Sequence, residues 1–228
     1  MIRLLGILLA RFAGADTACA SGQSLIQKVH NVATARDCAL LVEDDCSFDT
    51  EPNANFSCYI EHGSRLMYTT WIRQVARVLE VGARYGQTSC LISKVLNPQK
   101  GSKLFSSDAD PAVWDVLEAN LQKHSCNAEV IRGVVGKEDV KIVSAARTGY
   151  GKHTTSPDDS EPGVLVKAHS VPSLKTKFDT LAIDCEGCFG DFLTENFELL
   201  DTHLGSNYRL VMSLHEYCYH IHHIYIIL

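Results

Sequence analysis

Apolar and polar residues follow two different rhythms along the chain from about residue 68 onward. Short, mostly apolar runs have the length and composition of buried strands, and they occur at 78–81, 103–106, 129–135, 178–183 and 208–214. Other stretches repeat apolar positions at helical spacing, at 68–77, 88–96, 110–121 and 189–200. Because strands alternate with helices, we expect an α/β fold with a Rossmann-like, doubly wound, mostly parallel sheet.

Turn and cap residues predict where some of these elements begin and end. Asn97-Pro98 should stop the helix that starts near residue 88, since a residue before proline avoids the helical region. Asp110 and Pro111 have the order of an N-cap followed by a first-turn proline, which predicts a helix from this point. Residues 148–163 are rich in Gly, Ser, Pro and Asp, and we expect a loop there.

The N-terminal part of the chain differs from the rest. Arg3 precedes the apolar run 4–10 and then small residues, which is the order of a secretory signal peptide, so we expect one at 1–20. A frayed helix or a weak anchor is the alternative. Residues 21–70 are expected to form a Cys-containing extension, and 71–228 the main domain. No other stretch approaches the length of a membrane-spanning helix, so no stable span is expected.

Cysteine usage and charge bear on location and partners. The chain has nine Cys, and four lie before position 60, at Cys19, Cys38, Cys46 and Cys58. Disulfides stapling the extension would place the protein in an oxidising compartment, the secretory lumen or the extracellular space, with the cytoplasm as the alternative. Their pairing cannot be read from spacing. The net charge is −6 with no basic block, so we expect no nucleic-acid partner.

A glycine loop follows the first predicted strand of the main domain. The run 78–86 reads V-L-E-V-G-A-R-Y-G, a strand that leads into Gly-x-x-x-Gly and then a helix. Glycines let the backbone turn and let a ligand approach, and the helix N-terminus behind them favours a carboxylate or phosphate. The loop residues predicted to bind a cofactor are Glu80, Gly82, Ala83, Tyr85 and Gly86.

An acid at the end of the second strand narrows the kinds of cofactor that the glycine loop could bind. Asp108, followed by Ala109, lies where a carboxylate can accept hydrogen bonds from both hydroxyls of a ribose. The alternative is an acid that only caps a helix. Dinucleotide enzymes usually carry G-x-G-x-x-G, whereas position 84 here is Arg. The spacing E-x-G-x-x-x-G therefore favours S-adenosyl-L-methionine as the cofactor.

A third motif completes an ordered set that resembles a known family. The sequence E-V-G-A-R-Y-G, then D-A-D-P with L-E-A-N, then V-P-S-L and F-D-T-L-A-I-D-C-E-G is similar to the FkbM-type methyltransferases. The resemblance spans residues 78–216 and implies methyl transfer from S-adenosylmethionine to a hydroxyl of a sugar or other small molecule. Two positions depart from the family pattern, with Ala182 where it has Lys and Phe189 where it has an acid.

Methyl transfer needs an aligned acceptor and a group that removes its proton. Asp184 and Glu186 follow the fourth predicted strand and are the first candidates for the catalytic site. His215, which ends the fifth strand, is a further candidate base because His titrates near neutral pH. The alternatives are that Asp184 only hydrogen-bonds to nearby backbone and that His215 has no role.

Other features compete with this interpretation. Cys185 and Cys188 form a C-x-x-C that suits redox chemistry, and the His-rich tail suits zinc, but we predict neither a redox function nor a metal site. A catalytically decayed cofactor-binding domain is the main alternative function, and an NAD-dependent oxidoreductase is the other. Few residues follow the fifth strand, so we expect a sheet without the usual C-terminal hairpin. The acceptor, the metal dependence and the oligomeric state are not determined by the sequence.

Overall fold

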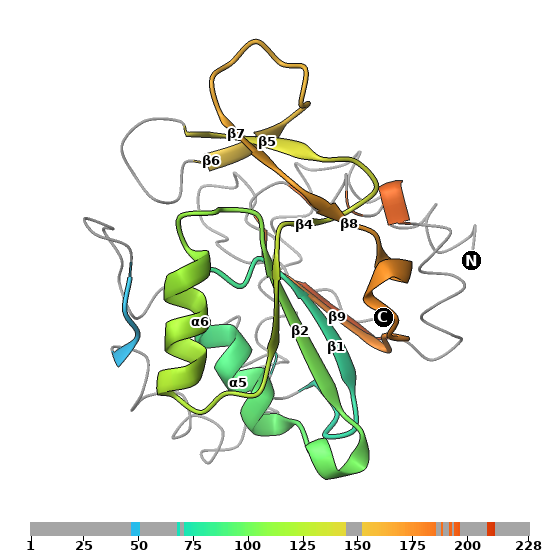
Figure 1. Ribbon diagram of the computed structural model, residues 1–228. Coiled ribbons are helices and arrows are strands. Elements are labelled where there is room, and N and C mark those ends of the chain that lie inside the picture. Colours follow the sequence, from blue (N-terminus) through green and yellow to red (C-terminus); the bar gives the residue numbers. More distant parts are fainter. Residues whose placement is uncertain are drawn as a thin grey trace, which may run out of the picture.

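The central feature is a five-stranded parallel sheet. The computed structural model, drawn in Figure 1, describes residues 47–50, 68, 71–144, 152–185, 188, 192, 194–196 and 209–212. The strand order is β10-β9-β1-β2-β3 and every neighbouring pair is parallel. These strands are β1 (Arg77–Val81), β2 (Lys103–Asp108), β3 (Glu129–Arg132), β9 (Thr180–Ile183) and β10 (Arg209–Met212). The prediction of a Rossmann-like, doubly wound parallel sheet is confirmed.

Two helices connect the first three strands. The helix α5 (Gln87–Val95) leads from β1 to β2, and α6 (Trp114–Lys123) leads from β2 to β3. Both lie on the same side of β1 and β2 in Figure 1, as successive right-handed crossovers in one direction along a sheet require. Because β9 pairs with the other edge of β1, the chain reverses its direction across the sheet between β1 and β9.

Alternation along the strands divides the core between the two faces of the sheet. Leu79 of β1 and Leu181 of β9 pack on one face, together with Phe192. Val78 and Ala182 pack on the other face, against Ile92 of α5. Strands buried on both sides tend to be apolar throughout, which is why the sequence pattern predicted β1 and β9 well. β2 is also buried, although it carries Ser106, Ser107 and Asp108.

The structure corrects two boundaries. The helix expected from Asp110 begins at Trp114. Asp110 does not cap that helix, because its carboxylate accepts a hydrogen bond from the backbone N–H of Ala112 and forms a local turn. The single strand expected at 129–135 is broken at Gly133, whose φ is 151°. Its second half, β4 (Val134–Val135), pairs with β8 (Ala168–His169) and not with the central sheet.

The predicted loop at 148–163 is also partly wrong. Within it, β6 (Lys152–Thr155) pairs with β5 (Val140–Ser144), which in turn pairs with β7 (Val164–Val166) in an antiparallel sheet. Figure 1 shows this small sheet beyond the carboxyl end of β3. Polar composition suggested a loop, but pairing with β5 satisfies the backbone of a polar edge strand equally well.

The expected helix at 68–77 ends earlier than its pattern suggested. Tyr68 and Trp71 are helical, and the chain then turns before β1 begins at Arg77. Of the helix expected at 189–200, Phe192 and 194–196 are described, and they are helical. The calls that lie outside the described residues are the signal peptide at 1–20, the extension cysteines Cys19, Cys38, Cys46 and Cys58, the proposed catalytic residues Glu186 and His215, and the His-rich tail.

Membrane spans and metal clusters are absent from the part of the chain that the structure describes. No helix among the described residues is long and apolar enough to cross a membrane. No group of three or more His, Cys, Asp or Glu side chains in the same part of the chain is arranged to hold a metal ion.

Disulfides occur inside the main domain. Cys90 in α5 is bonded to Cys126, which follows α6, across 36 residues, and Cys185 is bonded to Cys188 across three. A cross-link over a longer loop removes more conformational entropy from the unfolded chain. The first bond therefore ties the two helices together behind the glycine loop, whereas the second holds a single turn.

We expect the two disulfides to differ in their effect on stability. Replacing Cys90 and Cys126 together with alanine should lower the free energy of unfolding by about 4 kcal/mol, because of the long loop that the bond closes. The matched pair, Cys185 and Cys188 to alanine, should lower it by about 2 kcal/mol. Urea unfolding of both variants checks this ranking. An equal or larger loss from the short-loop pair would contradict it.

Candidate functional site

The turn between β1 and α5 lies against the carboxyl ends of two strands. Gly82 and Gly86 have φ values of 94° and 90°, which favour glycine. The N–H of Gly82 donates to the carbonyl of Ser107 at 2.9 Å, and the N–H of Asp184 donates to that of Val81 at 2.9 Å. A β-carbon on Gly82 would collide with the carbonyl oxygen of Asp184. These hydrogen bonds hold the turn at the carboxyl ends of the strands. Between β1 and β9 the strand order reverses, and open α/β sheets bind ligands at such a point.

The helix behind this turn begins without a side-chain cap. Gly86 is the N-cap residue of α5, and the first turn of α5 contains no acidic residue. The first N–H groups of a helix have no partner within the helix and carry partial positive charge, which suits an anionic group. A β-carbon on Gly86 would also lie 2.9 Å from Cδ1 of Leu117 in α6. Glycine at this position thus allows both the turn and the close packing of the two helices.

Asp108 is held beside the turn by backbone donors. Its Oδ2 accepts a hydrogen bond from the N–H of Arg84 at 2.7 Å, and its Oδ1 accepts one from the N–H of Asp110 at 2.8 Å. The indole N–H of Trp114 donates to its carbonyl at 2.7 Å. Burial raises the pKa of Asp108, and the two backbone hydrogen bonds oppose that rise. Each carboxylate oxygen keeps a second lone pair, so the group has the capacity to accept ribose hydroxyls.

Glu80 lies beneath the turn and not on its surface. Its side chain is 2% exposed, and the hydroxyls of Ser89 and Ser106 both donate to its Oε2 at 2.6 Å. Its Oε1 has no hydrogen-bond partner among the described residues. Burial raises the pKa of Glu80 to about 7 against the opposing effect of the two hydroxyls, and the nearby charges of Asp184 and Asp108 raise it further. Glu80 therefore links β1, β2 and α5 as a carboxyl group that is half protonated near neutral pH.

We expect Glu80 to make stability depend on pH. Between pH 4.5, the usual pKa of Glu, and about 7, the folded chain binds more protons than the unfolded chain, so the free energy of unfolding falls as pH rises. The slope should reach about 1 kcal/mol per pH unit, and it should be clearly smaller in Glu80→Gln, where the raised pKa of Asp108 still contributes. Denaturant unfolding from pH 5 to pH 8 measures it. Glu118→Gln is the control, because Arg132 lowers the pKa of that exposed carboxylate. A Glu80→Gln variant with the wild-type slope would contradict the assignment.

The other predicted loop residues have different surroundings. Ala83 and Tyr85 are buried, and the N–H of Ala83 donates to the carbonyl of Ser107 at 3.0 Å. Arg84 adopts a left-handed conformation with φ of 45°. Its guanidinium lies 3.7 Å from the carboxylate of Asp110 and 5.0 Å from the centre of the Tyr85 ring. The arginine that distinguishes this loop from a dinucleotide loop is thus held at the same edge as Asp108.

The predicted catalytic side of the site is described in part. Asp184 directly follows β9, is half-buried, and is close enough to Glu80 to raise its pKa. The structure therefore brings together Glu80, Asp108 and Asp184 at the carboxyl ends of β1, β2 and β9. The Cys185–Cys188 disulfide comes next and packs against the core. Glu186 and His215 lie outside the described residues, so their roles stay predictions.

Sequence reasoning did not identify three polar residues that support the turn. Ser89 and Ser106 hold Glu80, and Asn120 of α6 donates to the carbonyl of Tyr85 at 2.9 Å. Asn120 is fully buried between the apolar positions of its helix. The sequence did contain one indication of the role of Asn120, because it lies among the apolar positions of its helix. A buried amide there must have hydrogen-bond partners within the protein.

Comparisons with known proteins give structural similarity alone. No family model matches the sequence, and no curated protein matches it. Precorrin-6y C5,15-methyltransferase from Geobacter metallireducens is similar in structure, with a TM-score of 0.48, 15% identity, and 76% of this chain and 70% of that chain covered. A protein-L-isoaspartate O-methyltransferase has a TM-score of 0.47 and 10% identity, with 85% and 55% covered. An O-methyltransferase from Bacillus cereus in complex with SAH has a TM-score of 0.37 and 13% identity, with 83% and 72% covered.

The topology and the turn together define the class of this chain. It is a Rossmann-like α/β protein with a glycine turn, a buried acid under that turn and a carboxylate at the end of the neighbouring strand. The choice of cofactor depends on the charges of the residues around the turn.

Proposed function

We propose that this chain is an S-adenosylmethionine-dependent methyltransferase that transfers a methyl group to a hydroxyl of a sugar or other small molecule. The observation that carries the proposal is the group of three carboxyl side chains around the glycine turn. Glu80 and Asp108 come from the neighbouring strands β1 and β2, and Asp184 directly follows β9, which pairs with the other edge of β1. Burial is the main cause of the raised pKa of Glu80, and the charges of Asp184 and Asp108 add to it. Such a site favours a ligand with positive charge.

This charge distribution separates the candidate cofactors. A dinucleotide brings a pyrophosphate with about two negative charges, which the carboxylates of Asp108 and Asp184 would repel. S-adenosylmethionine brings a sulfonium and an ammonium group, which they attract, and a carboxylate, which suits the uncapped N-terminus of α5. The side chain of Arg84 also lies where a dinucleotide loop has the glycine that admits the phosphates.

The residues present fit this cofactor. Asp108, whose carboxylate is already fixed by the N–H of Arg84, would accept hydrogen bonds from the ribose hydroxyls, with Ala109 beside it. Glu80 would hold the turn in place from below through Ser89 and Ser106. When bound, S-adenosylmethionine supplies an electrophilic methyl group. Asp184 would face the reacting atoms from the end of β9.

Proton removal is the remaining chemical requirement. A hydroxyl acceptor must lose its proton as its oxygen attacks, and a carboxylate within hydrogen-bond reach can accept it. Asp184 and Glu186 are the candidates for this role, with His215 as a second base. Ala182, which replaces the lysine of the FkbM pattern, is buried against α5 and does not contribute a charge at this edge.

Calorimetric titration of the full purified chain tests the proposal. S-adenosylhomocysteine and S-adenosylmethionine should each bind with micromolar affinity, and NAD should not bind. A folded chain that binds neither nucleoside, or that binds NAD more tightly, would exclude the methyltransferase assignment. A transfer assay with labelled methyl groups and a panel of hydroxylated acceptors then separates an enzyme from a catalytically decayed cofactor-binding domain.

We also propose that the protein resides in the secretory lumen or outside the cell. The disulfides Cys90–Cys126 and Cys185–Cys188 support this location, because such bonds persist in oxidising compartments. The acidic net charge and the absence of a basic block support a small-molecule acceptor over a nucleic acid. Fractionation of cells that express the full chain, with protease protection of the lumen, distinguishes this location from the cytoplasm.

A further inference from the structure

A short segment of the N-terminal region lies against α6, far from it in sequence. Residues 47–50, drawn in blue beside the green helix α6 in Figure 1, are named here the N-terminal strap. The backbone N–H of Asp49 donates to Oδ1 of Asn120 at 2.9 Å, and Nδ2 of Asn120 donates to the carbonyl of Asp49 at 2.9 Å. One side-chain amide thus pairs with both backbone groups of Asp49, as a neighbouring strand would.

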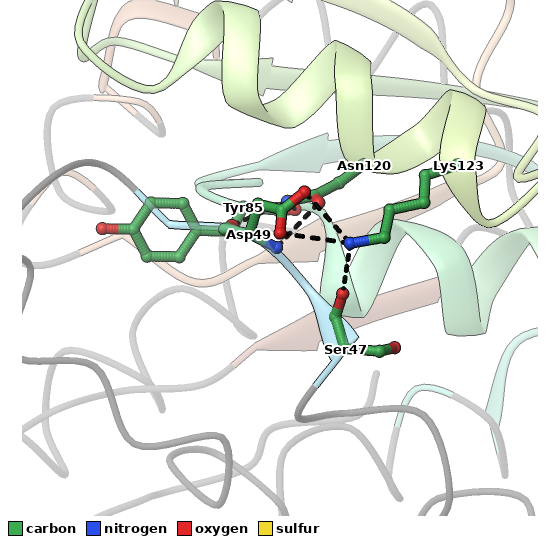
Figure 2. A network of polar contacts seen from close by, with 5 residues as sticks. All are labelled: Ser47, Asp49, Tyr85, Asn120 and Lys123. Carbon is green, nitrogen blue, oxygen red and sulfur yellow. Dashed lines mark hydrogen bonds and ion pairs between the residues drawn. The ribbon is translucent and has the colours of Figure 1, made fainter.

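The same amide also holds the glycine turn. Nδ2 of Asn120 donates a second hydrogen bond to the carbonyl of Tyr85 at 2.9 Å, and Tyr85 directly precedes Gly86, the N-cap residue of α5. Figure 2 shows the side chain of Asn120 reaching the point where Asp49 and Tyr85 meet. Because the amide group is planar, its oxygen and nitrogen cannot turn independently. A displacement of Asp49 therefore changes the direction of the donor at Tyr85.

Because Asn120 is buried, its amide depends on these backbone partners. Asn120 is fully buried, and it lies on the face of α6 that carries Leu117 and Leu121. A buried amide must satisfy its hydrogen-bonding groups within the protein, since water is excluded. Both polar atoms of the Asn120 amide are bonded to backbone groups of the strap and the turn. The arrangement recognises backbone, so it does not depend on the side chain at position 49.

Three further contacts keep the strap in register on α6. Nζ of Lys123 donates to the carbonyl of Ser47 at 2.8 Å and lies 3.0 Å from the carboxylate of Asp49, as Figure 2 shows. The ring of Phe48 stacks on His124 with centroids 4.0 Å apart and an interplanar angle of 9°. Three consecutive strap residues are therefore held by the last turn of one helix and the residue that follows it.

We propose that the N-terminal strap orders the cofactor turn, with Asn120 as the positioning residue that connects them. Residues outside the main domain would thereby set how firmly the turn from Gly82 to Gly86 is held for its ligand. The part of this proposal that concerns affinity rests on the proposed binding of S-adenosylmethionine. The coupling between strap and turn does not, because it exists in the protein without ligand.

Two variants at one position test the coupling in the full chain. Asp49→Pro removes the backbone N–H that donates to Asn120, together with the carboxylate. Asp49→Ala removes the carboxylate alone and is the matched control for the exposed ion pair with Lys123. Amide hydrogen exchange of residues 82–90 is measured in the ligand-free proteins, with the amides of β1 and β9 as an internal reference. The dissociation constant for S-adenosylhomocysteine is then measured by calorimetry.

Asp49→Pro should accelerate exchange at residues 82–90 about tenfold while β1 and β9 keep wild-type rates, and it should weaken S-adenosylhomocysteine binding about tenfold. Asp49→Ala should change each quantity less than threefold. Unchanged exchange at the turn in Asp49→Pro would overturn the proposal, and so would equal acceleration throughout the sheet, which indicates general destabilisation. If the wild-type chain binds no S-adenosylhomocysteine, the proposed function fails, whereas the exchange result still decides the role of the strap.

Discussion

Asp108→Ala is expected to weaken binding of S-adenosylhomocysteine about 100-fold or more. The carboxylate would accept hydrogen bonds from both ribose hydroxyls, and bonds to a charged group contribute about 1.5–3 kcal/mol each. The substitution also removes the acceptor for the N–H groups of Arg84 and Asp110. The turn would lose one of its fixed points together with the ribose contact. Calorimetric titration at the pH used for the wild-type chain measures the change.

Two further variants separate the ribose contact from the support of the turn. Asp108→Asn keeps the size of the side chain and one acceptor, so its fold should be closer to wild type while its affinity remains at least tenfold reduced. Asp115→Ala is the matched control, since Asp115 is an exposed acid at the start of α6, and its affinity should stay within twofold. Wild-type affinity in a folded Asp108→Ala variant would remove Asp108 from the cofactor site.

Gly82→Ala should be the most destabilising single substitution that we predict. A β-carbon at this position collides with the carbonyl oxygen of Asp184, and the φ of 94° is unfavourable for alanine in any case. The obstacle is the backbone directly after β9, which is hydrogen-bonded to β1 through the N–H of Asp184 and cannot move without disturbing the sheet. We expect a loss of about 4 kcal/mol or more in the free energy of unfolding, a magnitude that points to a specific structural cause. Thermal and urea unfolding measure it.

Gly101→Ala provides a matched control for backbone strain. Gly101 has a φ of 79°, and a β-carbon there would meet no heavy atom within 4 Å. Gly101→Ala should therefore lower the free energy of unfolding only by the cost of placing alanine in the left-handed region, about 1–2 kcal/mol. The difference between the two alanine variants measures the close approach of the turn to β9. Equal losses at Gly82 and Gly101 would mean that the approach is less tight than described.

Much of the central sheet could be predicted from the chain alone. The sequence places β1, β2, β9 and β10 to within a few residues. For β1 and β9 the reason is that strands buried on both faces have few polar positions. The errors fell where local signals are ambiguous. Asp110-Pro111 fits a helix start and a local turn equally well, and the carboxylate of Asp110 bonded to the N–H of Ala112. The composition of β6 predicts a loop, because its residues are polar. The pairing with β5 that makes it a strand is not visible in the segment itself.

The candidate site could also be predicted only in part. The motif predicted Gly82, Gly86 and Asp108 at one edge of the sheet, and the structure brings them together there. The sequence did not indicate that Glu80 is buried beneath the turn, because the two hydroxyls that hold it come from β2 and α5. The two disulfides were also beyond prediction, since pairing depends on which Cys side chains the fold brings together.

The sequence by itself determined the alternation of strands and helices, the position of the glycine turn and the acid that follows the second strand. These features depend on periodicity and on residues with special backbone freedom, which are properties of short segments. Only the tertiary structure decided the pKa of Glu80, the pairing of Cys90 with Cys126 and the connection from Asp49 through Asn120 to Tyr85. Each of these depends on burial or on contact between distant segments, which arise when the helices close over the sheet.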